Sequence, residues 1–350
     1  MQHRVRVPHA TLVNTFMQAM ANAESDSFYL RWKSHDKNAP SSSMIRGSAV
    51  VNGTIAYFNS ATSKTIYGYD TVSEMWFSLP NCPQQCFALV VLKGALTAIG
   101  GFCRIQATNK LQTLIEKDSA STRGSATWTD SKYPAMPTMR GRVAAVSTED
   151  NLVVAGGQLA VVTQIGGVLR RVEIMDINTQ QWFNACSLPY ELTEPSMTLC
   201  GSRLYIVGGW SSNDRTKSVL SCDLQALVET GTARSASPAS PTARLENSVW
   251  NEVADIPSYA STALTVNGDI LLGIGGCDEK ESPTDTIYWY NPKANMWSCV
   301  GHMQTKRFRA LVTMLPSTGD KPQLMVIGGS SNADGALSGK GEIAELVIPS

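Results

Sequence analysis

The chain has 350 residues, of which 43 % are hydrophobic and 17 % are charged. Its 29 basic and 29 acidic residues cancel, so it lacks the basic surface by which proteins bind nucleic acids or anionic membranes. No apolar run approaches the roughly 20 residues that are needed to cross a bilayer. We therefore expect a monomeric protein that binds neither nucleic acid nor membrane.

The N-terminus and the cysteines together indicate a compartment. Residues 1–27 contain no acid before Glu24, and polar residues interrupt any secretory core, so we interpret them as a flexible or partly helical extension. The eight cysteines are scattered, and the one close pair, Cys82 and Cys86, has neither a zinc nor a redox spacing. We expect reduced thiols, no metal, no cofactor and a cytoplasmic location.

A pair of adjacent glycines recurs five times along the chain, each time at the end of a short apolar run. The pairs are Gly100-Gly101, Gly156-Gly157, Gly208-Gly209, Gly275-Gly276 and Gly328-Gly329. A tryptophan follows each of the first four pairs. Repetition at a spacing of several tens of residues indicates that one supersecondary unit is reused.

In chain order, six such units can be laid out, each with four predicted strands. They span about 46–80, 88–130, 142–189, 196–250, 261–300 and 310–350. The first unit turns at Asn52-Gly53, a strong hairpin signal, and has Asn59-Ser60 where the others have glycines. The second unit carries an extra loop before Trp128. The fourth carries a Ser/Ala/Pro-rich insertion at about 229–246, which we expect to be disordered.

The two ends of the chain complement each other. The sixth unit ends without a tryptophan, whereas the stretch around Trp32 has the pattern of an outer strand and no unit in front of it. Open sheet edges promote aggregation, so we expect the N-terminal strand to complete the last unit and close a ring. One tryptophan then belongs to each unit: Trp32, Trp76, Trp128, Trp182, Trp250 and Trp297.

The glycines and tryptophans have a physical interpretation. Glycine at the end of the second strand lets a large neighbour approach the backbone, and the tryptophan of the fourth strand would fill that space. Four-stranded units of this kind pack face to face as the blades of a propeller. The sequence thus predicts an all-β, six-bladed propeller over 28–350.

At this level the sequence resembles the kelch-repeat family. The resemblance rests on the glycine pairs, the tryptophans, the turn at Tyr290-Asn291-Pro292 and the entry segment Met136–Arg140, and it covers nearly all of the chain from about Tyr29. It implies four antiparallel strands in each blade. Most such propellers bind other proteins, and a few are enzymes.

The enzymatic alternatives lack their motifs. Copper oxidases that resemble this fold need several histidines, and only His3, His9, His35 and His302 exist. No Gly-x-Ser-x-Gly elbow or phosphate-binding glycine loop is present. A sugar-processing enzyme, such as the kelch-like sialic-acid epimerases, stays open because the sequence does not place side chains in a central channel.

The loops give the positive signal. In kelch proteins that bind peptides, the binding face is formed by residues just before the first strand of each blade and by the loops after the glycines. In this chain those positions hold Arg46, Ser48, Arg104, Arg140, Arg142, Trp210, Tyr259, Ser261, Arg307 and Arg309. Several arginines around one mouth would attract carboxylates or phosphates, which arginine binds through paired hydrogen bonds.

The sequence therefore favours a non-catalytic module that binds an acidic or phosphorylated peptide of another protein. One alternative is the substrate-recognition part of a ubiquitin-ligase adaptor, although the stretch before Tyr29 is too short for the BTB domain that such adaptors carry. The other is the sugar-processing enzyme.

Overall fold

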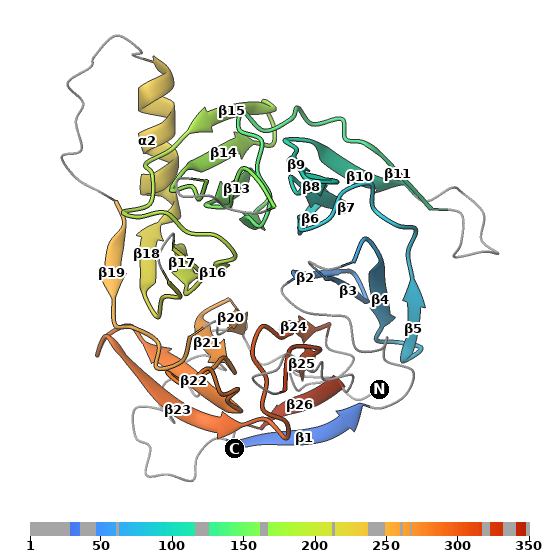
Figure 1. Ribbon diagram of the computed structural model, residues 1–350, viewed down its shortest axis with the longest axis vertical. Helices are drawn as coiled ribbons and strands as arrows, with labels where there is room; N and C mark the ends of the chain where they lie inside the picture. The colour runs from blue at the N-terminus through green and yellow to red at the C-terminus, as the bar shows by residue number, and fades with distance from the viewer. Residues whose placement is uncertain are drawn as a thin grey trace, which may run out of the picture.

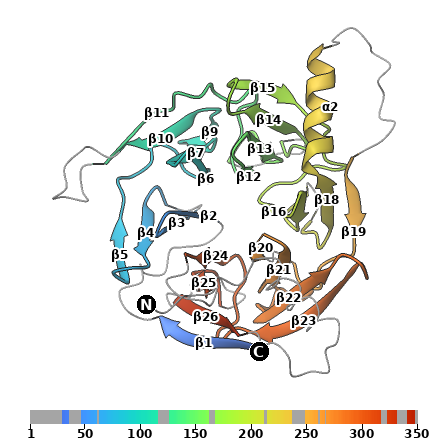
Figure 2. The same ribbon diagram turned by 180° about the vertical axis from the view of Figure 1, so that it is seen from behind.

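A computed structural model shows a ring of six four-stranded antiparallel sheets around a central channel (Figures 1 and 2). It describes residues 29–35, 47–60, 63–115, 126–161, 167–211, 214–236, 249–259, 262–266, 268–316, 323–331 and 341–347. The expected six-bladed propeller is confirmed, with the strands of each blade ordered from the channel outward. The predicted extension 1–27 and the loop before Trp128 lie outside the described residues.

The first three blades have these strands. Blade 1 contains β2 (Ala49–Asn52), β3 (Ile55–Asn59), β4 (Ile66–Asp70) and β5 (Met75–Ser78). Blade 2 contains β6 (Ala88–Leu92), β7 (Ala95–Ile99), β10 (Leu111–Ile115) and β11 (Thr127–Asp130), with the small hairpin β8 (Phe102–Cys103) and β9 (Gln106–Ala107) between its second and third strands. Blade 3 contains β12 (Ala144–Ser147), β13 (Asn151–Ala155), β14 (Val172–Asp176) and β15 (Gln181–Asn184).

The other three blades follow the same plan. Blade 4 contains β16 (Ser196–Cys200), β17 (Arg203–Val207), β18 (Val219–Asp223) and β19 (Asn251–Val253), with helix α2 (Leu224–Ala236) after β18. Blade 5 contains β20 (Thr262–Val266), β21 (Ile270–Ile274), β22 (Thr286–Asn291) and β23 (Met296–His302). Blade 6 contains β24 (Leu311–Leu315), β25 (Gln323–Ile327), β26 (Gly341–Val347) and, from the other end of the chain, β1 (Tyr29–His35).

The ring closes as the sequence predicted. Strand β1 pairs antiparallel with β26 along its whole length, and Trp32 stands opposite Ala344. Sheet pairing between the two ends of the chain gives the last blade its fourth strand and covers an edge that would otherwise be open.

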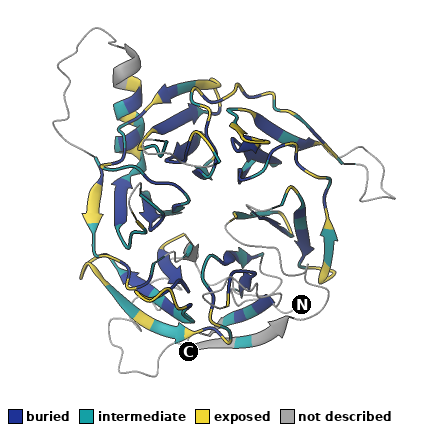
Figure 3. Ribbon diagram, viewed as in Figure 1, coloured by how far each residue is buried: buried dark blue, intermediate teal, exposed yellow. Residues whose placement is uncertain are grey.

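The core consists of six apolar clusters, one between each pair of neighbouring blades. The cluster between blades 6 and 1 joins Leu311 and Met325 to Phe58 and Tyr69, so the closing interface is packed like the other five. Figure 3 shows the buried residues in the strands of every blade, with exposed residues at the turns and outer strands. Within the described ranges, no helix has the length and apolarity to span a membrane.

Glycine is required in these pairs for a different reason from the one expected. Both glycines of every pair have positive φ, between 61° and 108°, a backbone conformation that side chains disfavour. A Cβ on Gly100 would lie 2.5 Å from the carbonyl oxygen of Arg140 in the next blade, and one on Gly101 would lie 2.5 Å from that of Gln85 in its own blade. The atoms that approach the glycines are therefore backbone carbonyls of two entry segments, where we had expected a tryptophan.

The tryptophans join one blade to the next. The indole Nε1 of Trp128 in blade 2 donates to the carbonyl of Pro80, at 2.9 Å, just after the last strand of blade 1. The same bond is made by three further tryptophans: Trp182 to Pro134, Trp250 to Cys186 and Trp297 to Ala254. Each of these rings thus fixes the exit of the preceding blade.

Helix α2 corrects the predicted insertion. Residues 229–236, which we expected to be disordered, form its second half, whereas 237–248 lie outside the described residues. Asp223 caps the helix by accepting from the Ala226 N–H at 3.1 Å. Leu227 is fully buried in the cluster between blades 3 and 4, and Gly231 packs against Phe183 on β15. The helix therefore covers the outer strand of the neighbouring blade (Figure 1).

Candidate functional site

The candidate site is the mouth of the central channel, on the face where each blade begins. In four blades the second residue before the first strand is a non-glycine residue with positive φ: Cys86 (55°), Arg142 (54°), Glu194 (54°) and Arg309 (59°). Such residues are uncommon, and they cluster at binding sites where the surrounding structure enforces them. All four line one cavity of about 110 Å³.

Backbone hydrogen bonds enforce this conformation. In five blades, the third residue before the first strand forms two backbone N–H···O bonds with the residue that directly follows the glycine pair. In blade 4, for example, these bonds join Thr193 and Trp210 at 2.8 and 2.9 Å. Neighbouring blades are linked as well, because Arg142 donates its N–H to the Cys86 carbonyl and Glu194 donates its N–H to the Arg142 carbonyl. The glycine pairs therefore build a rigid collar that presents one side chain each from blades 2, 3, 4 and 6 to the mouth.

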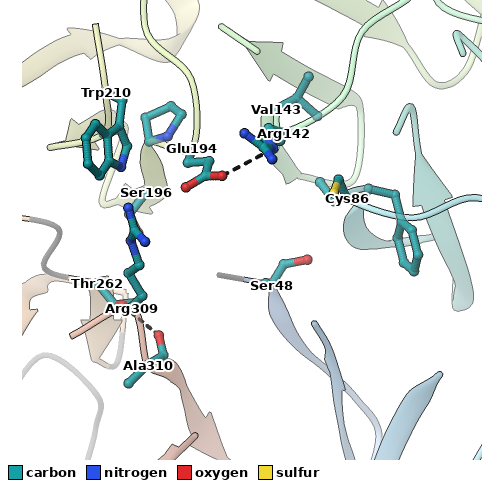
Figure 4. Close-up of a pocket in the computed structure, with 15 residues that line it drawn as sticks. Ser48, Cys86, Arg142, Val143, Glu194, Ser196, Trp210, Thr262, Arg309 and Ala310 are labelled. Carbon is teal, nitrogen blue, oxygen red and sulfur yellow. Dashed lines mark hydrogen bonds and ion pairs between the residues drawn. The ribbon is translucent and has the colours of Figure 1, made fainter. Parts of the chain in front are cut away.

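Arg142 and Glu194 form an ion pair across this collar, with 3.3 Å between Nε and a carboxylate oxygen (Figure 4). The exposed fractions of the two side chains are 24 % and 13 %, so water screens the pair only in part. Ser48 also lines the cavity, but its hydroxyl is tied to the Asn59 side chain at 2.8 Å and accepts from the Leu89 N–H.

Arg309 lies on the other side of the mouth against an aromatic ring. Its guanidinium carbon is 4.9 Å from the centre of the Trp210 ring, and Figure 4 shows it extended from blade 6 toward blade 4. Among the described residues, no carboxylate forms an ion pair with Arg309. Stacking of this kind fixes a guanidinium while leaving its N–H edge able to donate.

A second cation lies between two aromatic rings beside the mouth. Arg215 is 5.6 Å from the Trp210 ring and 5.3 Å from the Tyr259 ring, and it forms an ion pair with Glu281 at 2.7 Å. Lys217 lies 4.4 Å from the same tyrosine ring. Trp210 and Tyr259 are thus held by cations from blade 4 that sequence reasoning missed. The signal was the basic pair in the loop after Gly208-Gly209.

Below the mouth, the channel is lined by apolar side chains mixed with hydroxyl groups such as those of Ser147, Thr198 and Thr313. Its walls are the first strands of the blades, and their residues include Ala49, Val50, Val91, Ala145 and Met197. Among the lining residues, the charged side chains are therefore concentrated at one end of the channel.

Two of the predicted binding residues are structural instead. Arg140 is fully buried and forms an ion pair with Glu173 at 3.0 Å, and its guanidinium also donates to the carbonyls of Gly156, Arg171 and Val154. Arg307 is equally buried and bonds Glu342 at 2.9 Å and the Gly328 carbonyl at 2.7 Å. Burial lowers the pKa of Arg140 to about 10 and also lowers that of Arg307. Neither side chain is therefore accessible to another protein.

The remaining predicted residues divide as follows. Arg104 is exposed at the tip of the β8–β9 hairpin, outside the residues that line the mouth. Arg46 and Ser261 lie outside the described residues. The mouth brings together Ser48, Arg142, Trp210 and Arg309, with Tyr259 beside them.

Comparison with known proteins agrees with this geometry. The family described as Kelch motif matches residues 258–304, which contain blade 5. The structure is a kelch-type propeller. A solved structure titled "Structure of YjhT" is similar with a TM-score of 0.61 and 16 % identity, covering 86 % of this chain and 95 % of that one. A search of curated proteins gave no match.

Blades 2 to 6 share the collar geometry, but the residues that they present to the mouth differ. Blade 2 presents Cys86, blades 3 and 6 present arginines, and blade 4 presents Glu194. The repeat therefore sets where the side chains lie, and the residue at each position sets the chemistry.

Proposed function

We propose that this propeller is a protein-interaction module that binds an acidic or phosphorylated segment of a partner at the mouth of its channel. The observation that supports this most is Arg309, which Trp210 holds in place and no described carboxylate neutralises. A carboxylate or phosphate of the partner would complete its hydrogen bonds.

Arg142 gives the second contact. Its ion pair with Glu194 is partly open to water, so an incoming anion can share the guanidinium or displace the glutamate. Glu194 also disfavours anions that approach Arg142 without reaching Arg309, and such repulsion contributes to specificity. Trp210 and Tyr259 would add apolar contact for the neighbouring residues of the segment.

Selection of peptides from a random display library on the full chain tests this proposal. We expect the selected peptides to carry Asp or Glu next to an apolar residue, and we expect their binding to weaken as salt increases. A selection without enrichment of acidic residues would contradict the proposal, provided that the chain is shown to be folded by circular dichroism.

The same mouth supports a second candidate, the sugar-processing enzyme. An arginine pair and a carboxylate, Glu194, at the end of the channel are the groups that such an enzyme would use to bind and turn over a sugar acid. Proton NMR of N-acetylneuraminate with the protein distinguishes the two candidates. Anomer exchange faster than in buffer, lost in Glu194→Gln, would favour the enzyme.

A further inference from the structure

A thiol, an imidazole and a carboxylate lie in line at the outer rim of blade 5, away from the mouth. The Cys299 sulfur is 3.8 Å from His302 Nε2, and His302 Nδ1 is 2.9 Å from the Asp285 carboxylate. The sulfur is also 3.8 Å from the Gly301 carbonyl. Cys299 and His302 lie on β23, and Asp285 precedes β22 (Figure 1).

A β-bulge creates this arrangement. Residues 299 and 302 are three apart, so in a regular strand their side chains would point to opposite faces. Here Tyr288 pairs with Cys299 and the adjacent Ile287 pairs with Gly301, so Val300 is an extra residue. The bulge brings the thiol and the imidazole to one side, which is a common use of bulges at reactive sites.

The hydrogen bonds also set the protonation pattern. Nδ1 faces a carboxylate that can only accept, so Nδ1 carries the proton and Nε2 presents its lone pair to the thiol. The backbone supports the pair, because Met303 donates its N–H to the Asp285 carbonyl at 2.7 Å. The line of groups is a nucleophile, a base and an orienting carboxylate, and among the described residues no group of three such side chains could hold a metal ion.

We propose that Cys299 is a modification site, where the cysteine reacts with the disulfide of a small thiol, such as glutathione disulfide, to form a mixed disulfide. His302 accepts the thiol proton, and Asp285 positions the imidazole and stabilises its positive charge. The thiolate attacks one sulfur of the disulfide, a new S–S bond forms and the old one breaks. The departing thiolate takes the proton from His302, so the cysteine is oxidised and one small thiol is released.

The chain contains a matched control for this proposal. Cys299 and Cys103 are both exposed. Cys103 is followed by Arg104, so it has a neighbouring cation, but within the described ranges it forms no hydrogen bond with a histidine. The remaining six cysteines are buried or half-buried. Comparing the two exposed thiols within one molecule removes differences in concentration and folding.

The experiment is timed labelling of the full chain with glutathione disulfide and, separately, iodoacetamide, followed by peptide mass spectrometry. We expect Cys299 to react roughly tenfold faster than Cys103 with either reagent. His302→Gln should remove this difference. Asp285→Asn should reduce it, and Asp285→Glu, which keeps the carboxylate, should restore part of it.

The internal control separates loss of the base from loss of the fold. A misfolded variant would change the Cys103 rate and the thermal transition, whereas loss of the base changes only the Cys299 rate. Equal rates at Cys299 and Cys103 in the wild type would overturn the proposal. A Cys299 rate that is unaffected by His302→Gln would do the same.

Discussion

Two residue positions, separated by a single residue, have opposite roles in blades 3 and 6. Arg140 and Arg307 point into the protein and are fully buried, whereas Arg142 and Arg309 point into the mouth. The difference comes from the backbone. Arg142 and Arg309 have positive φ, whereas Arg140 and Arg307 each form an ion pair with a glutamate on the third strand of the same blade. Sequence alone grouped all four as one arginine-rich rim.

Arg140→Met tests the structural role. Removing the buried guanidinium leaves the buried Glu173 carboxylate with only the Thr138 hydroxyl and, at 4.0 Å, the half-exposed Arg171. Loss of one member of a buried ion pair costs about 3–5 kcal/mol of unfolding free energy. Arg104→Met, on the exposed hairpin tip, should change it by less than about 0.5 kcal/mol. Urea titration measures both. The double variant with Glu173→Met should recover much of the loss, and a stable Arg140→Met would refute the assignment.

At the scale of the element, helix α2 is the feature that the sequence pattern concealed. Leu224, Leu227 and Val228 have helical spacing, but the Ser/Ala/Pro-rich stretch that follows led us to begin the predicted disorder at residue 229 and so divide the pattern. Tertiary contacts stabilise the second half of the helix: Gly231 lets the Phe183 ring approach, and the Thr230 hydroxyl accepts from the Cys186 N–H. Such contacts between blades are not readable from local composition.

Asp223→Ala tests the capping of this helix. Loss of an N-cap costs about 0.5–2 kcal/mol of helix stability, so amide exchange in α2 should accelerate, whereas Glu229→Ala, on the exposed side, should have little effect. Bonds from the Ala226 N–H and the Ser202 hydroxyl lower the pKa of Asp223 below its ordinary value near 3.8. The cap is therefore present above that value and is lost as pH falls through the lowered pKa. Unchanged exchange in Asp223→Ala would exclude a capping role.

At the scale of the whole molecule, the repeat made the architecture predictable and left the site uncertain. Six units, the extra tryptophan and the unmatched N-terminal strand were enough to infer a closed ring. The role of the glycines could not be inferred in the same way, because it depends on carbonyls from two entry segments that meet only in the folded ring. For the same reason, the sequence could not separate Arg142 from Arg140.

Deletion of residues 1–35 tests ring closure. It removes β1 and leaves β26 with an open edge, so we expect self-association and a lower melting temperature. Deletion of 1–27 keeps β1 and should leave a monomer. Trp32→Ala, at a half-buried ring that packs on the cluster between blades 5 and 6, should cost about 3 kcal/mol. Light scattering with size-exclusion chromatography decides, and a monomeric 1–35 deletion with an unchanged melting temperature would contradict the closure.

The mouth as the binding surface is tested most directly by calorimetric titration of a selected acidic peptide into three proteins: the wild type, the Arg142→Glu/Arg309→Glu variant and Lys93→Glu. Lys93 lies in the turn between β6 and β7, at the far end of the channel. Lys93→Glu is therefore a control that reverses a charge on the face opposite the mouth. We expect the double variant to lose more than about 2 kcal/mol of binding free energy, the range of interface hot spots, and Lys93→Glu to bind like the wild type. Equal affinities of all three proteins would show that the partner binds elsewhere.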